Sequence, residues 1–259
     1  EKMKNQVQLI TYVDRFGGKD LTQLRELLTG PLKNVFGGVH LLPFFHKIDG
    51  ADAGFDPIDH TRVDDRLGDW SHVRQLAQEH DVMADVIVNH MSSESPQFLD
   101  FSANGAASKY NGLFLTMDAV FPKGATEQDL LNVYRPRPGM PFTVTTLANG
   151  ERRLLWTTFT PQQIDIDVHH PAGKAFQAAL FAQYGMPVLK VCVSDEDLQS
   201  ATLLSDLLLL GLRAAAVTSP CKAWLPSAVR ALGGHWESPP ASDLHLANDS
   251  QDAGNTLVV

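Results

Sequence analysis

The sequence predicts an α/β protein built from parallel strands. Strand-like and helix-like segments alternate along residues 7–90, one apolar segment has the composition of a strand buried on both faces, and 259 residues suffice for one barrel-sized domain. Strands that alternate with helices pair in parallel through right-handed crossovers. In such architectures the functional site lies where the strands end, so polar residues at strand ends are the first place to look for it.

The segment at residues 82–90 (VMADVIVNH) is predicted to be the buried strand. Its apolar and β-branched residues suit a strand that is covered on both faces of a parallel sheet. Asn89 and His90 come at its end and are therefore expected at the functional edge. Asp85 lies inside the run, where an unpaired carboxylate is costly, so we expect it to have a polar partner.

Two further strands are predicted before this segment, at residues 7–13 (VQLITYV) and 39–45 (VHLLPFF). A Gly- and Asp-rich loop is predicted at residues 46–60. Asp20 and Asp69 are each expected to cap a helix, because each precedes a run with apolar residues at helical spacing. These apolar residues are Leu21, Leu24, Leu27 and Leu28 in the first helix, and Trp70, Val73, Leu76 and Ala77 in the second.

The alternation stops after the third strand. Residues 91–167 show no long helical period and are too many for an ordinary connection, which predicts an inserted subdomain. The expected division is thus 1–90, 91–167 and 168–259. In the last part we predict a helix at 171–184, with Phe176, Ala179, Leu180 and Gln183 in register, and a buried helix at 198–210 that is apolar almost all round. The other elements predicted there are strands at 188–193, 212–218 and 244–247 and a helix at 224–232.

The composition argues against nucleic-acid-binding, membrane-spanning and disulfide-rich secreted proteins. A net charge of -9 argues against a nucleic-acid surface, and no apolar run is long enough to span a bilayer. Two cysteines do not make a disulfide framework, and the first residues lack the features of a secretion signal. A cytoplasmic protein is expected.

Four motifs occur in order between about residue 7 and about residue 173: DGADAGFDPIDH, DVIVNHMSSESPQF, YRPRPGMPF and FTPQQIDID. They resemble motifs of the sucrose phosphorylases, a branch of the α-amylase superfamily of retaining glycoside enzymes. The resemblance implies a (β/α)8 barrel with an inserted subdomain after the third strand. Since about six strands can be found where eight are needed, we expect an incomplete barrel.

The resemblance also implies a substrate-binding set of residues. Asp52 and His90 would hydrogen-bond hydroxyl groups of the glucosyl unit, and Phe55 would lie against the sugar face. Arg137 would meet phosphate or the fructosyl group, and Phe159 and Gln163 would border the acceptor side. Planar polar groups, aromatic faces and a permanently charged guanidinium suit a sugar and a phosphate. The expected partners are thus a small glucoside and phosphate, with no cofactor and no metal.

Retaining chemistry needs two carboxyl groups about 5–5.5 Å apart, a nucleophile and a general acid/base. The resemblance places Asp195 at the nucleophile position, yet Val193 stands where the family has Arg, and Asp195 also suits the N-cap of the helix at 198–210. No residue clearly matches the general acid of the family. Glu196, next to Asp195 in the sequence, and Glu237, after a Gly-Gly turn, are candidates, but neither clearly follows a predicted strand.

Purely structural roles remain open for several of the predicted binding residues. Asp52 suits a turn, Phe55 and Phe159 suit core packing, and Arg137 suits a solvated charge.

Three functions follow. The first is sucrose phosphorolysis by a retaining double displacement. The second is an inactive or truncated relative that keeps a sugar pocket. The third is a hydrolase or transglucosidase of the same superfamily. An incomplete barrel would also leave strand edges and apolar faces uncovered, from which we expect poor solubility, association with a second copy or a compensating rearrangement.

Overall fold

The computed structural model describes residues 7–49, 54–133, 135, 137–183, 200, 202–209, 214–217, 228, 230 and 255–258. The chain divides into two compact units, Glu1–Val188 and Leu189–Val259. Among the helices of the described residues, none has the length and apolar content required to cross a membrane.

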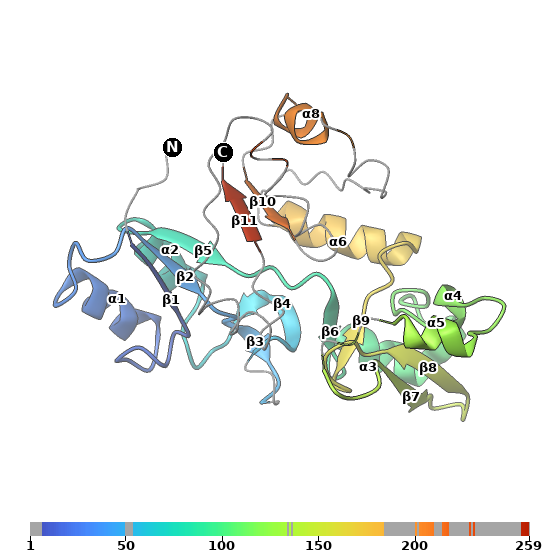
Figure 1. Ribbon diagram of the computed structural model, residues 1–259. Helices are drawn as coiled ribbons and strands as arrows, with labels where there is room; N and C mark the ends of the chain where they lie inside the picture. Colours follow the sequence, from blue (N-terminus) through green and yellow to red (C-terminus); the bar gives the residue numbers. More distant parts are fainter. Residues whose placement is uncertain are drawn as a thin grey trace. The chain divides into compact units, whose positions relative to one another are not determined.

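The first unit contains a parallel sheet in which β2 (Gly38–Leu41) lies between β1 (Gln8–Thr11) and β5 (Asp81–Ala84) (Figure 1). The register places Ile10, His40 and Met83 side by side across the sheet. The order and direction of these strands confirm the parallel alternation that the sequence predicts.

Two helices connect these strands, α1 (Leu21–Thr29) and α2 (Trp70–Ala77), and both begin where the sequence predicts. The Asp20 carboxylate accepts a hydrogen bond from the Gln23 backbone N–H at 2.9 Å. Asp69 caps α2 in a capping box with His72, whose Nδ1 lies 2.9 Å from the Asp69 carboxylate. Both caps satisfy backbone donors that a helix start leaves without an intrahelical acceptor.

The Asp20 cap leads to a simple prediction. Replacing Asp20 by Ala should lower the free energy of unfolding by about 1 kcal/mol, because the N–H of the first turn loses its acceptor. Chemical denaturation followed by circular dichroism measures the change. Asp20→Ser, which keeps a capping oxygen, is the control; an equal loss in both variants would rule out the cap as the cause.

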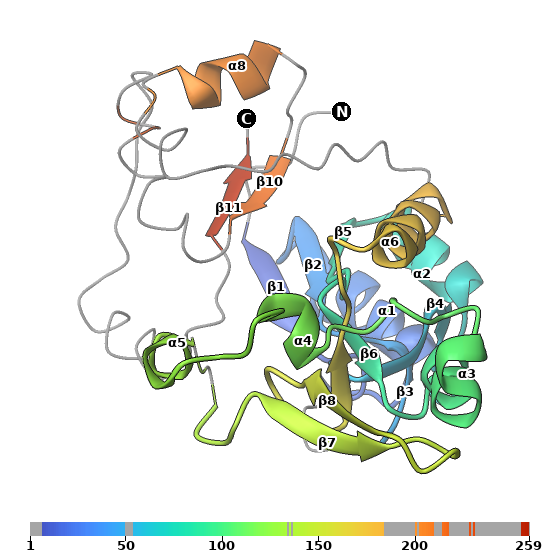
Figure 2. The same cartoon turned by 90° about the vertical axis from the view of Figure 1, so that its right-hand side faces the viewer.

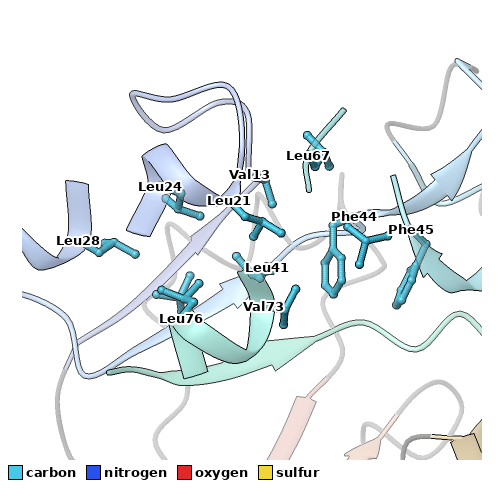
Figure 3. Close-up of a cluster of buried hydrophobic side chains, with 12 residues drawn as sticks. Val13, Leu21, Leu24, Leu28, Leu41, Phe44, Phe45, Leu67, Val73 and Leu76 are labelled. Carbon is cyan, nitrogen blue, oxygen red and sulfur yellow. The ribbon is translucent and has the colours of Figure 1, made fainter. Parts of the chain in front are cut away.

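A cluster of buried apolar side chains joins the two helices to the sheet (Figure 3). Leu24 and Leu28 of α1, Leu76 of α2 and Leu41 of β2 are all fully buried. Their spacing along α1 places Leu21, Leu24 and Leu28 on one helix face, as a 3.6-residue period requires. This cluster is the core of the α/β part of the first unit.

The prediction of one doubly buried strand at residues 82–90 is wrong. β5 ends at Ala84, and His90 begins a different strand, β6 (His90–Ser92), which pairs antiparallel with β9 (Gln163–Asp165). Within the described residues β2 is the only strand neighbour of β5, and Met83 and Ala84 are exposed, so neither face of β5 is fully covered. The apolar composition favours an extended chain, but a strand forms only where another strand supplies hydrogen bonds. The expected partner of Asp85 is present: its carboxylate lies 3.0 Å from His40 Nε2.

The predicted strand at residues 39–45 is likewise divided. β2 ends at Leu41, and β3 (Phe45–Lys47) pairs antiparallel with β4 (Pro57–Val63). Pro43 lies between the two strands and has no N–H to donate to a ladder. The predicted loop at residues 46–60 therefore contains a β-hairpin.

The chain from β6 onward builds a second apolar cluster, around Met91, Phe98, Phe114 and Leu155. Figure 2 shows the twisted hairpin of β7 and β8 in this region. Its elements are α3 (Pro96–Asn104), η1 (Gly105–Ala107), α4 (Met117–Val120), α5 (Glu127–Leu131), β7 (Phe142–Thr146), β8 (Arg152–Trp156) and β9. The helices are short, as the sequence predicts, and the boundaries of an inserted subdomain at 91–167 stay a prediction.

The helix α6 (Pro171–Gln183) confirms the prediction at residues 171–184. Its inward residues include Gly173, Phe176 and Leu180, whereas Ala179 and Gln183 are exposed, so the predicted register is wrong for the last two.

In the second unit, α8 (Leu203–Leu209) lies within the predicted helix at 198–210. Leu204 is buried, but Leu209 is 86% exposed, which contradicts burial all round. β10 (Ala214–Val217) confirms the predicted strand at 212–218 and pairs antiparallel with β11 (Asn255–Val258), a strand that the sequence does not predict. The strands predicted at 188–193 and 244–247 lie outside the described residues, as does the helix predicted at 224–232 apart from positions 228 and 230.

Candidate sugar-binding site

His90 is the best-defined member of the predicted site. It is the first residue of β6 and only 4% exposed. Its Nε2 lies 2.5 Å from the Phe55 carbonyl oxygen, so this ring nitrogen donates. The structure thus places His90 at the start of an antiparallel strand, not at the end of a parallel one.

The carbonyl oxygen of Phe55 is the point at which two predicted binding residues meet. Gln163 Nε2 donates to it at 3.0 Å, alongside His90 Nε2. Gly54, just before it, has φ +97°, a backbone conformation that residues with a Cβ rarely adopt. This glycine allows the turn that brings the Phe55 carbonyl to the two donors.

Phe159 completes the group. Its ring lies 5.4 Å from the His90 imidazole, centroid to centroid, at an interplanar angle of 60°. Phe55, His90 and the pair Phe159 and Gln163 come from three segments of the chain. Together they place two N–H donors at one carbonyl oxygen, one of them on the ring that contacts Phe159. An aromatic face next to planar donors is the chemistry that a sugar requires.

The remaining predicted residues are not part of this described group. Arg137 is exposed and lies between α5 and β7. Asp52 and Asp195 lie outside the described residues, as does Val193. The proposed pair of catalytic carboxyl groups therefore has no described geometry.

His60 forms a hydrogen bond to the backbone of His90 and was not predicted from the sequence as a site residue. Its Nε2 donates to the His90 carbonyl oxygen at 3.1 Å, and its ring packs edge-on against Phe176 of α6 at 5.5 Å. Burial lowers the pKa of His60 to about 4, so the ring is neutral at pH 7. The signal in the sequence was the final His of the motif DGADAGFDPIDH.

Asp165 is the second residue that sequence reasoning missed, although it lies in the quoted motif FTPQQIDID. It faces His90 across the β6–β9 ladder and is 5% exposed. Its carboxylate accepts hydrogen bonds from Asn89 Nδ2 and the Thr158 backbone N–H, both at 3.3 Å, and from the Thr158 hydroxyl. Burial raises its pKa to about 6, against the opposing effect of these donors.

A polar cavity of about 230 Å³ lies at the ends of β1 and β2. Tyr12, Asp14, Arg15 and Lys47 are among the residues that line it, and it includes none of the predicted site residues. Among the described residues, no three His, Cys, Asp or Glu side chains are grouped as a metal site would need.

Comparison with known proteins gives a consistent result. No family model matches the chain. The chain is 57% identical to sucrose phosphorylase of Agrobacterium vitis over 182 residues, which are 70% of this chain and 37% of the relative. It is 54% identical to sucrose phosphorylase of Bifidobacterium adolescentis over 181 residues, 70% of this chain and 36% of that relative. The resemblance to the sucrose phosphorylases is confirmed. The chain spans little more than a third of the length of these curated relatives.

Two solved structures resemble this chain in fold. Sucrose 6F-phosphate phosphorylase from Thermoanaerobacter thermosaccharolyticum matches with a TM-score of 0.65 and 33% identity, over 71% of this chain and 38% of that chain. The trehalulose synthase MutB from Pseudomonas mesoacidophila matches with a TM-score of 0.56 and 19% identity, over 69% of this chain and 32% of that chain. At that identity the second match shows the fold alone.

Proposed function

We propose that this chain takes part in glucosyl transfer of the sucrose phosphorylase type, which converts sucrose and phosphate to glucose 1-phosphate and fructose. The 57% identity to a sucrose phosphorylase over 70% of the chain carries the proposal. The meeting of His90 and Gln163 at the Phe55 carbonyl, with the Phe159 ring beside His90, supports it, since donors beside an aromatic ring suit a sugar.

The proposed architecture is a (β/α)8-type barrel, incomplete in this chain, with a subdomain at 91–167 inserted between barrel parts at 1–90 and 168–259. The parallel sheet supports it. One face of this sheet packs against α1 and α2, while Ile10 and Met83 on the other face remain exposed. An exposed apolar face is expected when the strands that would cover it are missing.

In the proposed reaction Asp195 attacks the anomeric carbon of the glucosyl unit, and the bond to fructose breaks as a general acid protonates the leaving oxygen. Phosphate, which gives its proton to the same group now acting as a general base, then attacks the same carbon, releases Asp195 and forms glucose 1-phosphate. The two inversions retain the configuration. The retaining course and the role of Asp195 are proposals.

The binding roles are also proposals. His90 and Asp52 hydrogen-bond glucosyl hydroxyl groups, and the rings of Phe55 and Phe159 lie against the sugar. Gln163 borders the acceptor, and Arg137 meets phosphate through its charged guanidinium. In the described structure the Phe55 carbonyl oxygen accepts hydrogen bonds from both His90 and Gln163. A sugar hydroxyl that binds to either donor would therefore have to replace the Phe55 carbonyl at that donor.

The decisive experiment incubates the purified chain with sucrose, with and without phosphate, and measures glucose 1-phosphate, fructose and glucose. Phosphate-dependent fructose release with an equal amount of glucose 1-phosphate is expected, and Asp195→Asn should abolish it. Release of glucose without a phosphate requirement would indicate the hydrolase or transglucosidase alternative and refute phosphorolysis.

An inactive sugar-binding relative is the second candidate, and Val193 favours it, because the family has at that position an Arg that would keep the nucleophile ionised. An inactive relative would release neither glucose 1-phosphate nor glucose from sucrose. Heat released on titration with glucose would then show that the pocket still binds sugar, and His90→Gln should weaken that binding.

Association of two copies is a further proposal. Val7 and Ile10 of the β1 region are 66% and 63% exposed, and apolar side chains of this kind favour contact with a second copy. Light scattering during size-exclusion chromatography measures the mass in solution; a monomer at all concentrations would refute it. A cytoplasmic location, expected from the cysteine count, likewise stays a proposal.

A further inference from the structure

The contacts of Asn89 connect the buried carboxylate of Asp165 to the ring of His90. Asn89 Nδ2 lies 3.3 Å from Asp165 Oδ1 and 3.3 Å from His90 Nδ1. An amide nitrogen carries two hydrogens, so it can donate to both acceptors at once. We propose that Asp165 is a positioning residue that holds the His90 ring in one orientation and one tautomer by orienting the Asn89 amide.

At pH 7 the Asp165 carboxyl is mainly ionised, because its pKa of about 6 lies below that pH. An ionised carboxylate only accepts hydrogen bonds, so the atom of Asn89 that faces it must be the nitrogen. The second hydrogen of this nitrogen is then directed at His90 Nδ1, which must accept and therefore carries no hydrogen. The ring hydrogen lies on Nε2.

The other side of the ring agrees with this assignment. His90 Nε2 faces the Phe55 carbonyl oxygen at 2.5 Å, and a carbonyl oxygen requires a donor. One neutral tautomer satisfies both contacts. The Nε2 hydrogen is thus available for an acceptor in the proposed site, whether the Phe55 carbonyl or a sugar hydroxyl.

Asp165 itself is held in place independently of Asn89. The Thr158 backbone N–H donates to Oδ1 and the Thr158 hydroxyl donates to Oδ2. Its backbone is paired with that of His90 in the β6–β9 ladder. The carboxylate is therefore fixed at the point from which it orients Asn89. The Thr158 backbone N–H acts on Oδ1, the oxygen that Asn89 faces, so loss of the Thr158 hydroxyl alone removes a bond to Oδ2 and leaves Oδ1 in place.

The experiment is a long-range ¹H–¹⁵N correlation spectrum of the chain labelled with ¹⁵N-histidine, with His90 assigned by comparison with His90→Gln. In the wild type we expect a hydrogen on Nε2 and a hydrogen-bonded, unprotonated Nδ1. In Asp165→Ala the Asn89 amide loses its acceptor and its orientation. The His90 Nδ1 signal should then move downfield to the position of a free ring nitrogen, or average between tautomers.

Two variants separate positioning from general disruption. Asp165→Asn keeps a carbonyl oxygen for Asn89 and can donate its amide to the Thr158 hydroxyl, so the wild-type His90 signals should return. Thr158→Val removes the hydroxyl bond to Oδ2 and leaves the Asn89 contact intact, so the signals should not move. Unchanged His90 signals in folded Asp165→Ala, or an equal change in Thr158→Val, would overturn the proposal.

If Asp165→Ala does not fold, Asn89→Leu makes the same test by removing the amide, and persistence of the wild-type Nδ1 signal would overturn the proposal. The consequence for catalysis rests on the proposed function. If the chain turns over sucrose, Asp165→Ala should lower kcat/KM by up to about 100-fold, as misplacement of a binding group does, with recovery in Asp165→Asn. If the wild type has no activity while the spectra behave as expected, the proposed function fails and the positioning role stands.

Discussion

Replacing His60 by Gln and Asp165 by Asn should change the pH dependence of stability in opposite directions between pH 6.5 and pH 4. In the wild type the two groups oppose each other across this range. Removing the titration of His60 should leave a chain that becomes more stable as the pH falls, and removing that of Asp165 should leave one that becomes less stable. Both groups are buried against the same strand, β6, which makes them a matched pair.

The sign for His60 follows from its lowered pKa. Burial of the ring lowers the pKa from 6.5 to about 4, and the hydrogen bond to the His90 carbonyl, which raises the pKa, offsets only part of this effect. Between these values the unfolded chain binds a proton that the folded chain does not, so stability falls as the pH falls. A shift of this size corresponds to about 3 kcal/mol. His60→Gln keeps an N–H that can reach the His90 carbonyl oxygen but does not titrate.

The sign for Asp165 is reversed. Burial raises its pKa from 3.8 to about 6, so between these values the folded chain binds a proton that the unfolded chain does not. Stability is greatest below the lower value and falls as the pH rises to the upper one, also by about 3 kcal/mol. Asp165→Asn removes this loss and keeps an acceptor for Asn89.

Urea denaturation at pH 4.0, 5.0, 6.0 and 7.0 measures the free energies of unfolding. The free energy of unfolding of His60→Gln minus that of Asp165→Asn should fall steeply from pH 4.0 to pH 7.0, whatever the absolute stability of each variant. Parallel curves for wild type and both variants would contradict the pKa shifts. Asp69, whose pKa is lowered to about 2 by hydrogen bonds from Ser71 and His72, is present in the wild type and in both variants, so its contribution cancels in the comparison.

Truncation of Leu24 on α1 should strongly destabilise the protein. Leu24 is 0% exposed and packs in the cluster between the helices and the parallel sheet (Figure 3). Leu24→Ala should lower the free energy of unfolding by about 2–5 kcal/mol, because it loses buried apolar contact and leaves a cavity. Helix propensity does not contribute, since Ala is the better helix former.

Leu99→Ala is the matched control. Leu99 also lies within a nine-residue helix, α3, but is 55% exposed, so the same chemical change should alter stability by less than about 0.5 kcal/mol. Both variants are compared with wild type by urea denaturation followed by circular dichroism. Equal losses at the two positions would show that the cluster around Leu24 does not stabilise the fold as described.

Most of the proposed binding site could be named from the sequence, but only through the motifs. Phe55, His90, Phe159 and Gln163 each lie in a quoted motif, and the structure brings them together. Nothing in the spacing shows that the Phe55 backbone carbonyl, not its ring alone, is the meeting point. His60 and Asp165 were missed because their importance comes from contacts with residues 30 and 75 positions away.

Local elements were determined by the sequence itself. The starts of α1 and α2 follow from Asp20 and Asp69, and the inward face of α1 follows from its leucines, because caps and helical faces depend on residues only a few positions apart. The pairing of extended segments was decided only by the tertiary structure. The run at residues 82–90 became two strands in two sheets because each half found its hydrogen-bond partner elsewhere in the chain, β5 beside β2 and β6 beside β9.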